Sequence, residues 1–399
     1  MLDDPTDEGT GDRSDDWTDR ADLAIVLSGG GARAAYQVGF LHRLGRELPD
    51  LRFPIITGVS AGAVNASYLA AHPGGLGRAA DGLAAIWRGL TVDDIFRVDL
   101  PSLARHLVRW ATHLAGGGSP VAPEVRGLVD SQPLRVTLER SSATVDGEII
   151  GIGRNLERGR LKAAAITALN YSTGQTVTWI QGRGLTWNEG QRRSYHARLG
   201  IEHVMASSAL PLFFPAVRLG EAWYGDGGMR HWAPLAPALR LGARRILALS
   251  PQYQPTAAEA ARPKIAAYPP PAQILSQLLN AVFLDVLDQD VERLELTNRL
   301  LAHLPREERG DLMPVDILVV RPSENLGELS AAYEPHLPKA FRYLTRSLGT
   351  RETTSPDFLS YLMFQPDYLE RLLAIGEKDA ETHLPEILEL VAGKALSVP

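Results

Sequence analysis

The sequence predicts an α/β fold in which a mostly parallel central sheet is flanked by helices and followed by a helical C-terminal extension. Two strand–turn–helix units follow each other between Leu23 and Ala71, and consecutive units of this kind build a parallel sheet with right-handed crossovers. Two later apolar runs, Arg245–Ser250 and Val315–Val320, are typical of buried parallel strands. The last part of the chain, up to about Leu396, has a helical pattern.

The first unit contains a glycine-rich turn. A buried-type strand at Leu23–Ser28 precedes it, and Ala35–Arg46 is expected to be helical. The turn reads Gly29-Gly30-Gly31-Ala32-Arg33-Ala34. Consecutive N–H groups at a helix N-terminus suit an anion, which makes this turn a candidate oxyanion site. A dinucleotide-binding turn is the competing interpretation, but its acidic residue should end the second strand, whereas Glu47 and Asp50 precede that strand.

The second unit has a serine at the apex of its turn. The strand Phe53–Thr57 leads into Gly58-Val59-Ser60-Ala61-Gly62, and an alanine-rich helix follows. This arrangement is typical of a nucleophile elbow, in which a strained serine stands clear of the sheet and flanking glycines avoid clashes. The alternative is an ordinary turn in which the serine caps the helix. In the elbow interpretation Ser60 is the nucleophile, and Gly58 and Gly62 support the turn.

The middle of the chain predicts helices and a pair of strands. Pro101–Leu114 is amphipathic, and it is either a lid or interfacial helix or a surface helix that faces the core. Ser131-Gln132-Pro133 starts another helix, with serine as the cap and proline in the first turn. Leu161–Leu169 and Thr176–Ile180 are expected to be strands. An apolar group at Leu210, Leu212, Phe213 and Phe214 lines an acyl groove or belongs to the core.

Asp226 is the candidate base for Ser60. It lies at the end of a short strand between Gly225 and Gly227-Gly228, where a carboxylate can approach another backbone closely. The alternative is an Asp-Gly turn without a catalytic role. Histidine is the usual base in a serine hydrolase. The downstream histidines are His231, His303 and His336, and none of them lies in a convincing turn.

The chain divides into three expected regions. Residues 1–20 hold eight acidic residues and two arginines, and this acidic tail is expected to be disordered. Residues 21–250 form the catalytic core. Residues 251–399 form a mostly helical C-terminal region packed on the core, with one sheet strand near residues 315–320. Six prolines between Pro251 and Pro271 mark a surface connection, and a helix at Ile274–Leu287 belongs to a long crossover.

The composition excludes several classes of protein. The net charge of −6 is carried by the acidic tail, so residues 21–399 are formally neutral and no basic face points to nucleic acid. The absence of cysteine excludes disulfides and thiolate chemistry. No apolar run approaches the ~18–20 residues of a membrane-spanning helix, and the N-terminus lacks a signal-peptide pattern. We expect a cytoplasmic protein, with or without peripheral contact at a membrane surface, that needs no metal and no cofactor.

Three ordered motifs, GGGARAAYQVG, GVSAG and DGG, each follow a predicted strand and together resemble the patatin-like phospholipases. The runs ASSALPLFFP and DGGMRHWAPLAPALRLGARRILALS are similar to later blocks of that family, so the resemblance covers about Leu23–Ser250. FLDVLDQDVERLELTNR and FLSYLMFQPDYLERLLAIGEKDA are similar to a bacterial subgroup with an additional C-terminal helical region. Ala34 stands where glycine is usual, and alanine is tolerated there if its φ is negative.

The resemblance implies a three-layer α/β/α fold and a serine lipid acyl hydrolase: a phospholipase A, a lysophospholipase or another carboxylic ester hydrolase. It implies that Ser60 and Asp226 form a dyad without histidine and that the substrate is a lipid ester. The oxyanion hole would use Gly29, Gly30 and Gly31, helped by Arg33. An acyltransferase with the same acyl-enzyme is the alternative, and a non-enzymatic lipid-binding protein is a further one, against which the intact motifs argue.

Overall fold

The structure is a computed structural model. It describes residues 22–97, 108, 112, 127–231, 233–262, 268–283, 286–347, 350 and 357–393. The acidic tail at residues 1–20 and all of the expected helix at Pro101–Leu114 except Val108 and Thr112 lie outside the described residues.

Parallel strands form the centre of a ten-stranded sheet, in the order β12-β11-β1-β2-β5. They are β1 (Leu23–Leu27), β2 (Ile55–Val59), β5 (Ala163–Asn170), β11 (Arg245–Leu249) and β12 (Asp316–Val320). Every residue of β1, β2, β5 and β11 is buried, as continuous apolar runs predict for parallel strands covered on both faces. The expected mostly parallel central sheet is therefore confirmed.

Beyond β5 the sheet becomes mixed. Strand β6 pairs antiparallel with β5, β8 pairs parallel with β6, and β7 pairs antiparallel with β8. Strand β10 also pairs antiparallel with β5 and with β9. The bounds are β6 (Thr176–Gly182), β7 (Asn188–Glu189), β8 (Arg192–His196), β9 (Val217–Leu219) and β10 (Ala222–Asp226). Because β10 turns back along β5, it brings Asp226 toward the carboxyl ends of the parallel strands.

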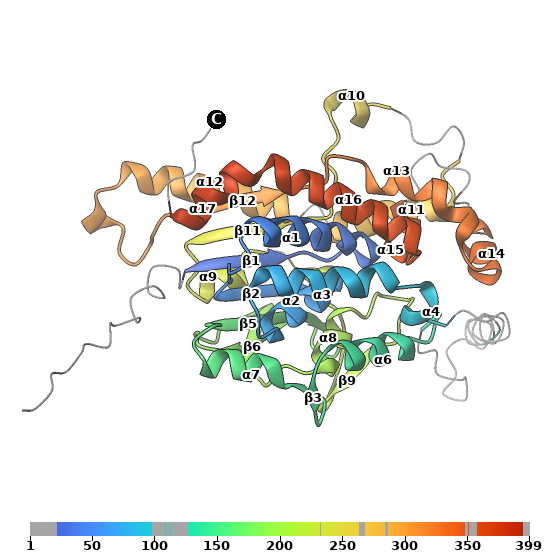
Figure 1. The fold of residues 1–399 in the computed structure, drawn as a ribbon, viewed down its shortest axis with the longest axis horizontal. Helices are drawn as coiled ribbons and strands as arrows, with labels where there is room; N and C mark the ends of the chain where they lie inside the picture. Colours follow the sequence, from blue (N-terminus) through green and yellow to red (C-terminus); the bar gives the residue numbers. More distant parts are fainter. Residues whose placement is uncertain are drawn as a thin grey trace, which may run out of the picture.

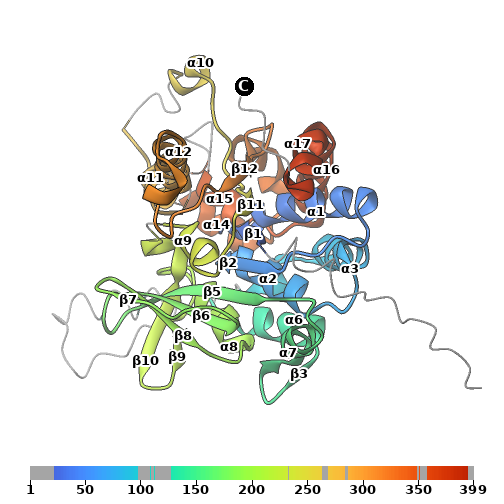
Figure 2. The same ribbon diagram turned by 90° about the vertical axis from the view of Figure 1, so that its left-hand side faces the viewer.

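The core has two parts, one on each face of the sheet. Leu23, Ile25 and Leu27 of β1 belong to one hydrophobic cluster, and the alternate residues Ala24 and Val26 belong to the other. The larger cluster packs under α1 (Ala35–Glu47), α2 (Ala61–Ala71), α3 (Leu76–Gly89) and α16 (Pro366–Thr382), and the smaller under α9 (Ala236–Arg240) and α12 (Val286–His303). Figure 2 shows β11, β1 and β2 between these two helical layers.

The C-terminal region packs on the N-terminal units. Figure 1 shows α16 beside α1, although the two helices are more than 300 residues apart in sequence. Gly39 of α1 permits this contact, since a Cβ there would lie 2.0 Å from the carbonyl oxygen of Leu373 in α16. The helix expected at Ile274–Leu287 is instead represented by α11 (Pro271–Phe283) and the start of α12 at Val286.

The remaining elements are short. They are α4 (Val92–Ile95), α6 (Gln132–Ser141), α7 (Ile150–Glu157), α8 (Ile201–Ser207), α10 (Ala257–Ala260), α13 (Leu326–Ser330), α14 (Lys339–Ser347), α15 (Asp357–Leu362), α17 (Leu384–Ala392), the strand pair β3 (Thr144–Val145) and β4 (Glu148–Ile149), and the 3₁₀ turns η1 (Gly31–Ala34), η2 (Gly227–Arg230), η3 (Arg306–Glu308) and η4 (Ala331–His336). Within the described ranges, no helix combines the length and apolar character needed to cross a membrane.

Candidate active site

Ser60 occupies a strained turn between β2 and α2. Its φ is 56° and its ψ is −134°. This combination is energetically unfavourable for an L-amino acid and is kept only where the surrounding structure enforces it. Only 6% of the residue is exposed. The sharp turn at the carboxyl end of a parallel strand, with the serine preceding a helix, has the geometry of a nucleophile elbow.

The glycines on both sides of Ser60 are required by close packing. A Cβ at Gly58 would lie 2.6 Å from the carbonyl oxygen of Gly62, and a Cβ at Gly62 would lie 2.2 Å from the carbonyl oxygen of Leu27. Gly29, in the neighbouring turn, faces Ser60 itself, since a Cβ there would lie 2.8 Å from the Ser60 Cβ. Small residues therefore let β1, β2 and α2 meet at the serine.

Ser60 and Asp226 are in direct contact. Ser60 Oγ donates a hydrogen bond of 2.6 Å to Asp226 Oδ2, across 166 residues of sequence. The other carboxylate oxygen, Oδ1, accepts the backbone N–H of Gly228 at 2.9 Å, and Asp226 has no exposed surface. Gly227 must be glycine for this approach, since a Cβ there would lie 2.2 Å from the carbonyl oxygen of Thr167. The structure thus brings together the two residues that the sequence suggested separately.

The buried position makes Asp226 a stronger base than an ordinary aspartate. Burial raises the pKa of Asp226 from 3.8 to about 7, and the hydrogen bonds from Ser60 and Gly228 oppose this rise. A group with this pKa is partly ionised at neutral pH and binds a proton readily, which is what a general base must do.

Two adjacent serines at the C-terminal end of α8, Ser207 and the C-cap Ser208, hold the elbow in place, and the sequence analysis assigned them no role. The backbone N–H of Ser60 donates to Ser207 Oγ at 2.9 Å, and Ser207 Oγ donates to the carbonyl oxygen of Thr167 at 2.6 Å. Ser208 Oγ donates to the carbonyl oxygen of Ser60 at 3.0 Å. The strained peptide is therefore bound on both sides. The only sequence signal was the adjacent pair of serines in the run ASSA.

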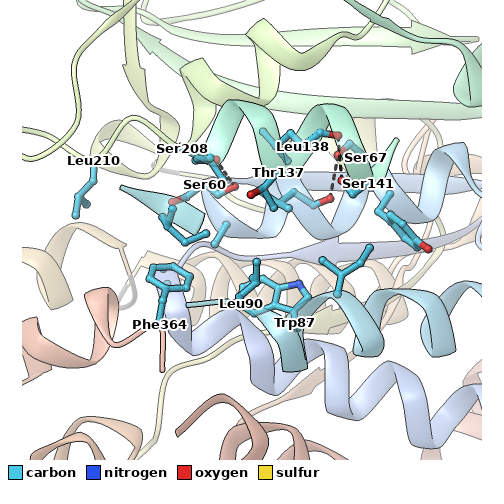
Figure 3. A pocket seen from close by; sticks show the side chains of 18 of the residues that line it. Ser60, Ser67, Trp87, Leu90, Thr137, Leu138, Ser141, Ser208, Leu210 and Phe364 are labelled. Atoms are coloured by element: carbon cyan, nitrogen blue, oxygen red, sulfur yellow. Dashed lines mark hydrogen bonds between the residues drawn. The ribbon is translucent and has the colours of Figure 1, made fainter. Parts of the chain in front are cut away.

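The glycine-rich turn lies beside the serine. Gly30 and Gly31 line the same pocket as Ser60, at the start of η1, where the first N–H groups of a helix lack intrahelical partners. Gly31 has a φ of 57°, which favours glycine. Ala34, where the resemblance leads one to expect glycine, has a φ of −66°, so its Cβ causes no strain. Figure 3 shows Ser60 at the pocket wall with Ser208 beside it.

The side chain of Arg33 is buried against the C-terminal region. Its guanidinium donates to Asp357 Oδ1 at 2.8 Å, and its Nε donates to Ser360 Oγ at 2.5 Å, both in α15. Its own backbone N–H donates to the carbonyl oxygen of Gly30 at 3.1 Å. A buried carboxylate from the C-terminal region thus pairs with the charge of Arg33, and a contribution of Arg33 to the oxyanion hole stays a prediction.

A deep apolar pocket opens from Ser60. The space between its lining atoms is about 920 Å³, including the part open to solvent. Its walls come from α2, α3, α6 and the C-terminal region: Ala61, Val64, Ser67, Tyr68, Leu83, Ile86, Trp87, Leu90, Leu134, Leu138, Tyr361, Leu362 and Phe364. Figure 3 shows Trp87, Leu90 and Phe364 on one side and Leu138 and Ser67 opposite.

The apolar group after α8 divides between pocket and core. Leu210 and Phe214 line the pocket, whereas Phe213 is buried and its ring lies 5.1 Å from that of Phe358. Leu212 is 59% exposed and has a φ of 68°. Leu210 and Phe214 thus face the pocket and Phe213 belongs to the core, whereas the acyl-groove interpretation stays a prediction.

The downstream histidines make no hydrogen bond to Ser60 or Asp226 in the part of the chain that the structure describes. Burial lowers the pKa of His231 to about 4, and its Nε2 has no partner among the described residues. His303 Nδ1 lies 2.7 Å from the carbonyl oxygen of Arg299 in α12, and His336 pairs with Asp367. Among the described side chains, no group of three or more His, Cys, Asp or Glu residues is arranged to hold a metal ion.

Comparison with known proteins identifies the family. The patatin-like phospholipase family matches residues 25–239, more than half of the chain. A search of curated proteins gives no match. Among solved structures, human GIVD cytosolic phospholipase A2 is 13% identical with a TM-score of 0.45, covering 93% of this chain and 60% of that one. VipD from Legionella pneumophila is 12% identical with a TM-score of 0.32, covering 89% and 67%.

The chain thus spans about 60% of the length of the human phospholipase that it resembles. The family match covers the elbow, the glycine-rich turn and the Asp226 turn, which are the same elements that converge in the structure. On this evidence the protein belongs to the patatin-like phospholipase family.

Proposed function

We propose that the protein is a serine lipid acyl hydrolase that acts on carboxylic esters with a Ser60–Asp226 dyad. Family membership supports lipid hydrolysis in general. The observation that carries the finer proposal is the 2.6 Å hydrogen bond between Ser60 Oγ and Asp226 Oδ2 at the mouth of an apolar pocket. A serine hydroxyl needs such a base because it is a weak nucleophile at neutral pH.

The reaction would proceed through an acyl-enzyme. Asp226 takes the proton of Ser60 as Oγ attacks the ester carbonyl, and the amides of Gly30 and Gly31 bind the oxyanion that forms. Collapse of this intermediate breaks the bond to the alcohol, which leaves with the proton from Asp226. Water then gives a proton to Asp226 and attacks the acyl carbonyl. When the bond to Ser60 breaks, Oγ recovers the proton, and the free acid is released.

The pocket supports a slender acyl chain as the part of the substrate that binds beside Ser60. Its lining follows one face of α2 at Ala61, Val64, Ser67 and Tyr68. With a rise of 1.5 Å per residue, the distance along the helix from Ser60 to Tyr68 is about 12 Å. Because its carbons zigzag, an extended chain advances by less than one carbon–carbon bond of about 1.5 Å per methylene group, so this length holds roughly nine or ten methylene groups. An acyl chain fits a pocket lined mostly by apolar side chains better than a polar group does.

The deciding experiment combines active-site labelling with product analysis. A fluorophosphonate probe should label wild-type protein at Ser60 and leave Ser60→Ala unlabelled. Incubation with phospholipids, lysophospholipids and acylglycerols should then release free fatty acid. Hydrolysis that survives in Ser60→Ala would contradict the proposal.

The same assay tests the acyltransferase alternative. Addition of an acceptor alcohol would yield a new ester at the expense of free acid if the acyl group is transferred in preference to water. A protein that binds these lipids but releases neither acid nor ester would support the non-enzymatic alternative.

A further inference from the structure

The side chain of Arg33 connects the glycine-rich turn to a buried site in the C-terminal region. Its Nη2 donates to Asp357 Oδ1 at 2.8 Å and to the carbonyl oxygen of Asp357 at 3.2 Å. Its Cζ lies 4.6 Å from the centre of the Tyr361 ring. The side chains of Arg33 and Asp357 are only 4% and 6% exposed. A buried ion pair thus links two segments that are 324 residues apart.

The carboxylate of Asp357 is itself fixed from two other sides. Its Oδ2 accepts Asn280 Nδ2 of α11 at 3.2 Å. Gly327 of α13 packs directly against it, since a Cβ at Gly327 would lie 1.8 Å from Asp357 Oδ1. Ser360 Oγ, which accepts from Arg33, donates in turn to the carbonyl oxygen of Asp357 at 2.5 Å. The partner of Arg33 is therefore held by three helices.

The turn also touches α15 through its backbone. A Cβ at Gly31 would lie 2.1 Å from the carbonyl oxygen of Tyr361, so turn and helix meet without an intervening side chain. Tyr361 lines the pocket together with Gly30, Gly31 and Ser60. Contact at Gly31 and the ion pair at Arg33 therefore fix the same short turn at two points.

We infer that Asp357 is a positioning residue that holds the oxyanion-binding turn through Arg33, an inference that rests on the proposed function. Oxyanion donors act only when they are preorganised, and glycine-rich backbone has little stiffness of its own. The guanidinium donates to one carboxylate oxygen of Asp357, to its carbonyl oxygen and to Ser360 Oγ, and three directed contacts fix its orientation as well as attract it. Because a buried ion pair adds little net stability, its main contribution here is a defined geometry.

The family match ends at residue 239, so α15 lies outside it. The inference therefore assigns a part in catalysis to the C-terminal region, which supplies both the anchor for the turn and part of the pocket wall.

The test compares two carboxylates that each pair with a buried arginine. Asp357→Asn keeps the shape of the side chain and removes the charge that faces Arg33. Asp22→Asn is the matched control, because Asp22 Oδ1 pairs with the buried Arg245 at 2.6 Å at the opposite, amino-terminal edge of the sheet. For each variant, kcat and KM on a short soluble ester and the rate of fluorophosphonate labelling are measured after circular dichroism has established that the protein is folded.

The inference predicts that Asp357→Asn lowers kcat and the labelling rate on the order of 10²-fold with KM unchanged, as loss of oxyanion geometry does. Asp22→Asn should keep wild-type kcat even if it is less stable. Wild-type kcat in folded Asp357→Asn, or an equal loss in both variants, would overturn the inference. Absence of labelling in the wild type would instead overturn the proposed function.

A second variant covers the case in which Asp357→Asn does not fold. Arg33→Met combined with Asp357→Leu replaces the pair by apolar side chains of similar size, a change that buried pairs often tolerate. The double variant should fold and show the same loss of kcat, because the directed contact to the turn is gone. Retention of wild-type kcat would refute a positioning role.

Discussion

Replacement of Asp226 by asparagine should strongly lower hydrolysis and yet stabilise the fold at alkaline pH. Burial raises the pKa of Asp226 from 3.8 to about 7, so the folded protein binds this proton more tightly than the unfolded chain does. The stability that results is fully present below the unfolded pKa and is lost as the pH rises through 7. Asparagine does not titrate, so the variant lacks the contribution of Asp226 to the pH dependence of the free energy of unfolding.

The size of this change in stability follows from the shift in the pKa of Asp226. One pKa unit corresponds to about 1.36 kcal/mol, so above pH 7 the buried charge lowers the free energy of unfolding by roughly 4 kcal/mol. At pH 5 the buried charge lowers the free energy of unfolding by only about 2 kcal/mol. The difference in unfolding free energy between Asp226→Asn and wild type should therefore grow by roughly 2–3 kcal/mol from pH 5 to pH 8.

Urea unfolding at pH 5 and pH 8, followed by circular dichroism, measures this difference directly. Asp50→Asn serves as the control because it removes an exposed carboxylate and should show no such growth. A difference between Asp226→Asn and wild type that is the same at both pH values would refute the reasoning, since it would mean that Asp226 is not held with a raised pKa.

Four further predictions concern catalysis and packing. Hydrolysis by the wild type should fall about tenfold per pH unit below pH 7, because the base is then protonated; a flat profile from pH 5 to 8 in a short-ester assay would contradict this. Asp226→Asn should lower kcat by roughly 10²–10⁴-fold, whereas folded His231→Ala should retain most of it; an equal loss would favour a triad. Val64→Trp, which places an indole in the pocket, should reduce turnover of long-chain esters at least tenfold while short esters are spared; equal losses would refute the acyl pocket. Gly62→Ala should lower the free energy of unfolding by at least about 1–3 kcal/mol in urea titrations, since the new Cβ would meet the carbonyl oxygen of Leu27; a wild-type midpoint would contradict the close packing.

The features that depend only on neighbouring residues in the sequence, namely the elbow and the buried strands, could be predicted. The glycine–serine–glycine pattern between a strand and an alanine-rich run identifies the elbow, because the strained turn and the close approach of α2 to β1 tolerate only small residues. The buried strands at the centre follow from uninterrupted apolar runs in the same way.

Contacts between distant segments could not be predicted from these patterns. Asp226 reaches Ser60 only because β10 pairs antiparallel with β5, whereas an Asp-Gly turn by itself specifies no partner. Ser207 and Ser208 have no local signature of their role, since their partners are backbone atoms of Ser60 and Thr167. The partner of Arg33 lies in a helix more than 300 residues away, so its charge could be taken for an oxyanion contact.

The wall formed by Tyr361, Leu362 and Phe364 also affects when activity can arise during synthesis. These residues follow Ser60 by about 300 positions, which a ribosome needs roughly 15–60 s to translate at 5–20 residues per second. Through that interval the nascent chain carries the nucleophile without a closed pocket or an anchored turn. We therefore expect ribosome-bound chains that stop before residue 357 to resist fluorophosphonate labelling and released full-length chains to react. The cell would then meet an active lipid hydrolase only after the segment with Tyr361, Leu362 and Phe364 has been translated.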